Sequence, residues 1–388
     1  MSATLHGVAL AGAYLGIFSA TVVYVPKHAI ILRTAATAAL VSLAYRFYQQ
    51  IFLILPYPAQ CSNVACFTLI CMASSGEILL ISRADANDVS VPAGKRQDTR
   101  QGKLALLWPA VCLPFNLRRV GTPWQIQRLW LRGSPSRSRF LARKFAELVV
   151  LYLLVDAITV APRPDLHLVA SEKQTLWRFS DLTAEDVSFR LMFTLGYHLM
   201  SFISGRFNVT CAAFLTVLLG ISEPEAWPHF NGPFSACSTM RGFWGTFWHQ
   251  MSRKTLTGWA ELISDRFLAL RRGTLTSRYT RLFLCFAISG VLHHCIDNAL
   301  QLSHWTLTGE KFFTVQALGI MFEDAVQAST RAYRIPKAVR KVVGFVWVFA
   351  FLSWTTPTWA YPALRNDLDI GHLLPFSVIT AYQKSKLA

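Results

Sequence analysis

Eight apolar stretches constrain this chain more than any other feature of its sequence. A run of about 20 apolar residues crosses a bilayer as a helix, in which every backbone polar group is satisfied internally. The stretches lie near residues 7–25, 30–55, 63–82, 145–161, 189–220, 282–302, 312–330 and 342–361. They predict an all-α, polytopic membrane protein with about eight transmembrane helices around a central cavity.

The composition agrees with a membrane class. The 388 residues are 53% hydrophobic and 15% charged, whereas a soluble domain is about 45–50% apolar and about 25% charged. The net charge of +17 is concentrated in a few runs of Lys and Arg. A nucleic-acid-binding protein would need a soluble recognition module, and the sequence shows none. We therefore expect the lipid bilayer as a partner and no nucleic acid.

The charged runs orient the predicted helices. Residues 116–144 contain eight basic side chains and no acidic ones, and 223–281 and 331–341 are also rich in Lys and Arg. Residues 162–188 are of mixed charge. By the positive-inside rule the first three segments face the cytosol and the last faces the lumen or exterior, which places both termini on the non-cytosolic side.

Several local features refine this picture. The second stretch is too long and contains Arg46, where we expect the helix to break or tilt. The run 104–115 is short and holds two prolines, so we expect it at the membrane interface. Eight Cys occur without a C-x-x-C pair, which favours small buried side chains and no metal site. No internal repeat or soluble domain is visible, so residues 1–388 form one membrane-embedded domain in this interpretation.

The sixth stretch, "LFLCFAISGVLHHCIDNAL", has two histidines near its centre. Polar residues at that depth are expensive and are functional candidates. Ser289, His293 and Asp297 are four residues apart and share one helical face, while His294 shares another with Asn298. A carboxylate one turn from an imidazole suits a general base. The alternative is that the His pair only makes hydrogen bonds between helices.

The seventh stretch contains "GIMFEDAVQ", so Glu323 and Asp324 lie in the interior of a predicted transmembrane helix. Either carboxylate would pair with the imidazoles or with Arg331 and Arg334. A purely structural role is an equally open alternative.

The stretch "FWGTFWHQMSR" at residues 243–253 is unusually aromatic. On a helix, Trp244 and Trp248 would stack on one face, with Phe243 and Phe247 beside them. The glycines at 242 and 245 would let a backbone or a ligand approach closely. Such aromatics occur both at membrane surfaces and in active sites, and composition alone leaves the choice open.

Two blocks of the sequence resemble a known family. "WPHFNGPFSACSTMRGFWGTFWHQMSRK" and, further on, "FAISGVLHH" resemble the wax-synthase-like branch of the membrane-bound O-acyltransferases. The first block is similar to that branch's F-W-x-x-x-W-H-Q signature and aligns His249 with the Asn of sterol and diacylglycerol relatives. The second is similar to the S-[GA]-x-x-H motif and aligns His293 with the catalytic His. The clear resemblance covers residues 220–300, and it departs at His294, where sterol-type relatives have Glu.

The resemblance implies transfer of an acyl group from acyl-coenzyme A to a hydroxyl, with no bound cofactor. His293 would be the general base, and His249, with Asn231 or Trp248, would stabilise the oxyanion or position the acyl group. Asp297 or Glu323 would orient the His. The walls of the substrate tunnel would be Phe243, Trp244, Phe247, Ser289 and His294.

Short members of this branch resemble fungal enzymes that acetylate terpenoid or meroterpenoid hydroxyls. Acetyl-coenzyme A and a hydrophobic alcohol are therefore the expected substrates, in the endoplasmic reticulum membrane. Long-chain wax ester synthesis is the first alternative. Outside this class, a transporter would use intramembrane His, Glu and Arg as an ion path, and a terpene cyclase would need carboxylates in several spans.

Overall fold

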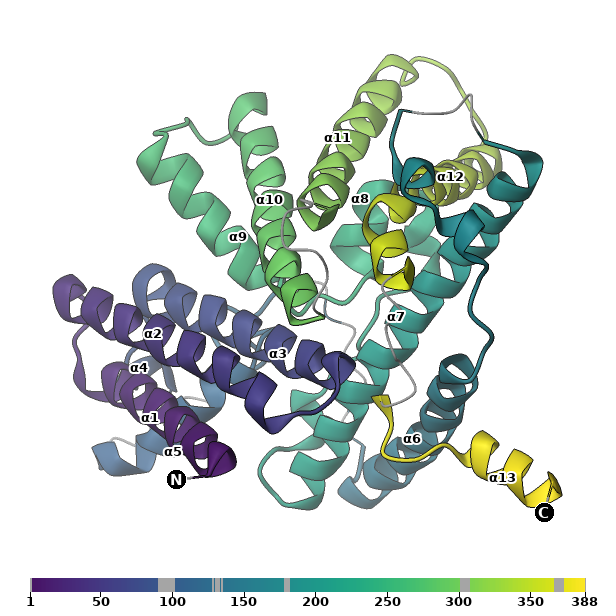
Figure 1. Cartoon of the computed structure of the whole chain (residues 1–388). Helices are drawn as coiled ribbons and strands as arrows, with labels where there is room; N and C mark the ends of the chain where they lie inside the picture. Colours follow the sequence, from purple (N-terminus) through teal and green to yellow (C-terminus); the bar gives the residue numbers. More distant parts are fainter. Residues whose placement is uncertain are drawn as a thin grey trace. The chain divides into compact units, whose positions relative to one another are not determined.

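The computed structural model describes residues 2–89, 102–127, 129, 133, 135–177, 182–300, 308–365 and 373–387. These residues form helices joined by loops, and the part of the chain that is described contains no strand (Figure 1). The prediction of an all-α chain is confirmed.

The chain divides into two compact units. Unit 1 comprises Met1–Gln127 and Gln250–Gln301, and unit 2 comprises Arg128–His249 and Leu302–Ala388. The helices of unit 1 are α1 (Ala3–Tyr24), α2 (Ile30–Ile54), α3 (Pro58–Gly76), η1 (Glu77–Ser82), α4 (Ala86–Val89), η2 (Lys103–Leu106), α5 (Leu107–Cys112), η3 (Leu113–Phe115), α9 (Arg253–Glu261), η9 (Leu262–Phe267) and α10 (Leu275–Ala299). Those of unit 2 are α6 (Arg137–Thr159), η4 (Leu166–Val169), η5 (Ser171–Gln174), α7 (Ala184–Leu218), η6 (Pro224–Ala226), η7 (Phe234–Ser238), α8 (Met240–Gly242), η8 (Phe243–Phe247), α11 (Thr308–Ser329), α12 (Lys337–Arg365) and α13 (Val378–Leu387).

Six helices are long and apolar enough to cross a membrane. They are Ala3–Tyr24, Ile30–Ile54, Pro58–Ser82, Ala184–Leu218, Leu275–Ala299 and Lys337–Arg365. Each contains most of one predicted stretch. The two remaining stretches, 145–161 and 312–330, lie mostly in α6 and α11, which have 23 and 22 residues but are not among these six. The chain is therefore a multi-pass membrane protein, and the number eight stays a prediction.

The expected break at Arg46 is wrong. Helix α2 runs without interruption from Ile30 to Ile54, and Arg46 is exposed on its surface. A long basic side chain can keep its charge away from apolar surroundings while its stem stays on the helix, so the backbone does not have to open. The run from Lys103 to Phe115 forms only short helical pieces, and its place at the membrane interface stays a prediction.

A buried arginine closes the turn between α1 and α2. Arg33 has no exposed surface and donates to the carbonyls of Val25 (2.7 Å), Pro26 (3.1 Å), Leu79 (3.2 Å) and Ala84 (2.9 Å). The carbonyls of Val25 and Pro26 follow α1, that of Leu79 lies in η1 and that of Ala84 follows η1. One side chain on α2 therefore ties the end of α1 to η1.

Unit 1 contains a second buried charge. Arg118 and Arg119 belong to the basic run 116–144, but they are only 7% and 0% exposed. Arg119 pairs at 2.8 Å with Glu77, whose side chain is also fully buried. The Nζ of Lys254 lies 3.5 Å from the same carboxylate. A buried carboxylate without a partner costs several kcal/mol, which explains why the arginine leaves the surface.

In unit 2, helices α6 and α7 pack along each other, and α12 packs against both α7 and α11 (Figure 1). Helix α7 begins with a capping box, in which the Thr183 hydroxyl accepts from the Asp186 N–H while the Asp186 carboxylate accepts from the Thr183 N–H. This reciprocal pair satisfies two backbone donors at the start of the helix.

Candidate functional site

The aromatic stretch of residues 243–253 is not one continuous helix, contrary to expectation. It forms a π-helical turn, η8, in which the Trp248 N–H donates to the Phe243 carbonyl at 2.8 Å. Trp248 itself is extended, with φ −60° and ψ 152°, and the next helix begins only at Arg253. Short π-helical segments are rare and occur frequently at functional sites. The turn releases Trp248 and His249 from helical geometry.

The π turn gathers three of the predicted tunnel residues, Phe243, Trp244 and Phe247, into an aromatic cluster with Trp248. The Trp248 ring lies 5.4 Å from Phe243, 5.8 Å from Trp244 and 5.7 Å from His249, measured between ring centroids. Phe247 is 5.8 Å from Phe243. Such separations are typical of favourable aromatic pairs. These rings meet through the π turn and not along the face of one α-helix, and their role as tunnel walls stays a prediction.

Two glycines allow the loop before this block to pack tightly. A Cβ on Gly242 would lie 2.1 Å from the Ala236 carbonyl oxygen, and one on Gly232 would lie 2.2 Å from the Thr246 carbonyl oxygen. The close backbone approach expected at Gly242 is therefore present. At Gly245 an added Cβ would meet no atom within 4 Å.

Sequence reasoning missed two polar residues that contact this cluster. His198 on α7 packs edge-on against Phe243 at 6.0 Å and Trp248 at 5.8 Å. Gln316 on α11 is fully buried and accepts at Oε1 from the Trp244 indole N–H at 3.3 Å. Both residues lie in apolar runs, where a polar side chain signals function or a specific contact.

Glu323 and Asp324 of α11 both contact α8, the short helix that precedes the π turn. Glu323, which is 8% exposed, accepts from the Met240 N–H at 2.7 Å and from the Trp347 indole at 3.2 Å. Asp324 pairs with Arg241 at 2.6 Å. The two carboxylates therefore position α8 and the π turn that follows it. The proposed role of Glu323 beside an imidazole stays a prediction.

In unit 1, His293 lies on α10, which packs against α3 and α9. Its Nδ1 is 2.7 Å from the Ser289 carbonyl and 3.5 Å from the Ser289 hydroxyl. A carbonyl only accepts, so Nδ1 carries the hydrogen and Nε2 is the basic nitrogen of the neutral ring. Ser289 and Asp297 are both buried, at 9% and 8% exposed, and His294 is partly exposed on the same helix. The expected helical register of these residues is confirmed.

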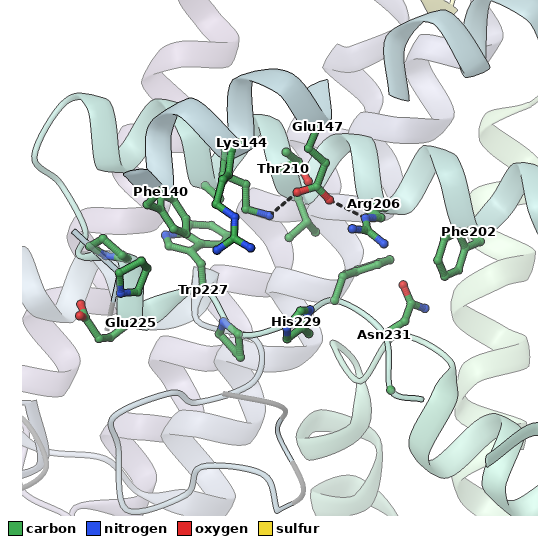
Figure 2. A pocket seen from close by; sticks show the side chains of 18 of the residues that line it. Phe140, Lys144, Glu147, Phe202, Arg206, Thr210, Glu225, Trp227, His229 and Asn231 are labelled. Carbon is green, nitrogen blue, oxygen red and sulfur yellow. Dashed lines mark hydrogen bonds and ion pairs between the residues drawn. The ribbon is translucent and has the colours of Figure 1, made fainter. Parts of the chain in front are cut away.

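A pocket of about 370 Å³ lies within unit 2. It is bounded by α6, α7, the loop after α7 and Phe247. Figure 2 shows Asn231 and Phe202 at one end and Glu225 at the other. Asn231 and Phe247, both predicted as site residues, thus line one cavity. The Asn231 amide N–H donates to the Phe247 carbonyl at 3.3 Å.

Comparison with known proteins places the two sequence blocks in a family context. The sequence pattern described as "Membrane bound O-acyl transferase family" matches residues 227–315. "Acetyltransferase pyr8" of Aspergillus fumigatus is 31% identical over 370 residues, which cover 90% of this chain and 85% of the relative. "Acetyltransferase aurG" of Calcarisporium arbuscula is 30% identical over 290 residues, which cover 71% and 70%. "Acetyltransferase spyB" of Aspergillus fumigatus is 34% identical over 275 residues, which cover 63% of this chain and less than half, 46%, of that relative.

Proposed function

The chain belongs to the membrane-bound O-acyltransferase family and is an acyltransferase, and on that premise we propose that it transfers an acetyl group from acetyl-coenzyme A to a hydroxyl of a terpenoid or meroterpenoid. The names of the fungal relatives support the acetyl group. An acyl-coenzyme A is the co-substrate that this chemistry requires. We place the protein in the endoplasmic reticulum membrane.

The observation that carries the mechanism is the hydrogen bond between His293 Nδ1 and the Ser289 carbonyl. It leaves Nε2 as the proton acceptor. The acceptor hydroxyl loses its proton to Nε2 as its oxygen attacks the thioester carbonyl, and a C–O bond forms. When the tetrahedral intermediate collapses, the C–S bond breaks and the imidazolium protonates the departing thiolate. General base catalysis of this kind contributes roughly 10²–10⁴-fold in rate.

The negative charge that develops on the carbonyl oxygen needs a donor. In this proposal His249 and the indole N–H of Trp248 supply it, and His249 is supported by the Phe230 ring, 5.8 Å away. Donors that are already oriented in a site of low dielectric stabilise such a charge more strongly than the same donors in water. Phe243, Trp244 and Phe247 form the tunnel wall.

Membership in an acyltransferase family decides against the transporter and the terpene cyclase. It leaves the length of the acyl chain to experiment. Microsomes that contain the chain are given acetyl-coenzyme A or long-chain acyl-coenzyme A together with a panel of terpenoid alcohols, and the products are weighed by mass spectrometry. We expect the gain of one acetyl unit. A gain only with long-chain donors would instead identify a wax ester synthase.

A further inference from the structure

The pocket in unit 2 contains a buried polar atom without a partner. Asn231 Oδ1 is inaccessible to solvent and accepts no hydrogen bond from the described residues. The amide orientation is fixed because its N–H group donates to the Phe247 carbonyl. A buried acceptor without a donor costs about 1–3 kcal/mol. A ligand with an O–H or N–H group aimed at this oxygen would remove that cost.

The walls around this oxygen suit an apolar scaffold. The pocket has about 370 Å³, which lies in the range of about 300–1,000 Å³ typical of small-molecule sites. Its aromatic wall comprises Phe140, Phe202, Trp227, Phe230, Phe234 and Phe247. Phe247 stacks on Phe202 at 6.1 Å with an interplanar angle of 10°. Since Phe247 also contacts Phe243, the pocket adjoins the signature aromatic cluster.

The charges of the lining favour a neutral ligand over the phosphates of coenzyme A. Arg143, Lys144 and Arg206 line the pocket together with Glu147 and Glu225. Glu147 pairs with both Lys144 (2.9 Å) and Arg206 (2.5 Å), as Figure 2 shows. Glu147 thus engages two of the three cations, and the three cations and two carboxylates of the lining leave a net charge of only +1. A ligand with several phosphates would require unpaired Arg or Lys side chains.

We propose that this pocket binds the acceptor alcohol, with its hydrocarbon scaffold against the aromatic wall and one of its hydroxyls donating to Asn231 Oδ1. The identification of the ligand as the acceptor rests on the proposed function. The role differs from oxyanion stabilisation, because the free atom of Asn231 is an acceptor and an oxyanion needs donors.

Photolabelling of the full chain in detergent tests this site without turnover. The probe is farnesol that carries a diazirine, and labelled peptides are identified by mass spectrometry. We expect saturable labelling in residues 202–213 and 227–234. Farnesol should compete, its deoxy hydrocarbon should compete about fivefold less well since it lacks the hydroxyl, and coenzyme A should not compete.

Variants separate this inference from the proposed chemistry. Asn231→Leu should raise the probe concentration that gives half-maximal labelling by about fivefold. Asn208→Leu, the same change at an exposed position of α7 outside the pocket, should leave that concentration unchanged. His293→Ala should abolish transfer and leave labelling intact. The inference is overturned if these segments are not labelled, if coenzyme A blocks the labelling, or if Asn231→Leu labels like the unchanged protein. If the unchanged protein is labelled as expected but transfers no acetyl group, that result counts against the proposed function alone.

Discussion

Glu323 on α11 and the backbone N–H of Met240 are joined by a hydrogen bond of 2.7 Å, although they are 83 residues apart in the chain. The same carboxylate oxygen accepts from the Trp347 indole. The bond holds Met240, the first residue of α8, so Glu323 is a positioning residue for the aromatic cluster.

Replacing Glu323 should therefore reduce turnover through geometry. Glu323→Ala leaves the buried Met240 N–H without an acceptor, which costs about 1–3 kcal/mol, and also removes the acceptor of the partly buried Trp347 indole. We expect a strong loss of acetyl transfer. Glu323→Gln keeps one carbonyl oxygen for these donors and should retain much of the activity. Steady-state kinetics of the purified variants measure whether Glu323→Gln turns over faster than Glu323→Ala. An equal loss of turnover in both variants would contradict a role based on hydrogen bonding.

A matched control is available at the neighbouring residue. Asp324 pairs with Arg241, whose side chain is 42% exposed. Exposed ion pairs contribute only about 0–1 kcal/mol, so Asp324→Asn should change turnover much less than Glu323→Ala. A larger loss of turnover in Asp324→Asn than in Glu323→Ala would contradict the assignment of Glu323 as the positioning residue.

The fully buried pair of Glu77 and Arg119 should behave as one unit. Glu77→Gln leaves the Arg119 charge without its partner, and we expect it to lower the free energy of unfolding by about 3–5 kcal/mol. Arg119→Met leaves Glu77 with Lys254 at 3.5 Å, so its loss should be smaller. The double variant should lose less than the sum of the two, because neither charge then remains. Thermal unfolding of the four proteins in one detergent measures the coupling. Additive losses would show that the pair contributes no specific interaction.

Two glycines of the signature region give opposite expectations. Gly232→Ala would place its Cβ 2.2 Å from the Thr246 carbonyl oxygen, so the loop must move away from the π turn. Gly245→Ala meets no atom within 4 Å. We expect Gly232→Ala to lose both thermal stability and acetyl transfer, and Gly245→Ala to retain both. If the two variants behave alike, the tight packing of the loop on η8 is not what supports the site.

Much of the fold follows from the sequence, because apolar runs longer than a bilayer is thick have few alternatives to a helix. The register of Ser289, His293 and Asp297 follows from helical spacing for the same reason. Local hydrogen-bond choices are less predictable. In the π turn at 243–247 each backbone hydrogen bond spans one residue more than in an α-helix, and no periodicity of the sequence marks that change.

Contacts between distant residues were the main omission. Arg119 pairs with Glu77, and Trp244 with Gln316, across 42 and 72 residues. A single sequence does not show which polar residue of one helix meets which of another. The signal in the sequence is a polar residue inside an apolar run, at Glu77, His198 and Gln316, and it is the same signal that marks the histidines of α10 and Glu323.

The most direct test compares acetyl transfer by the unchanged protein, His293→Ala and His294→Ala, with acetyl-coenzyme A binding measured on each. We predict that His293→Ala loses transfer by at least roughly 10²-fold while it still binds acetyl-coenzyme A, and that His294→Ala keeps most of its turnover. Sustained transfer by His293→Ala, or loss confined to His294→Ala, would contradict the assignment of the base.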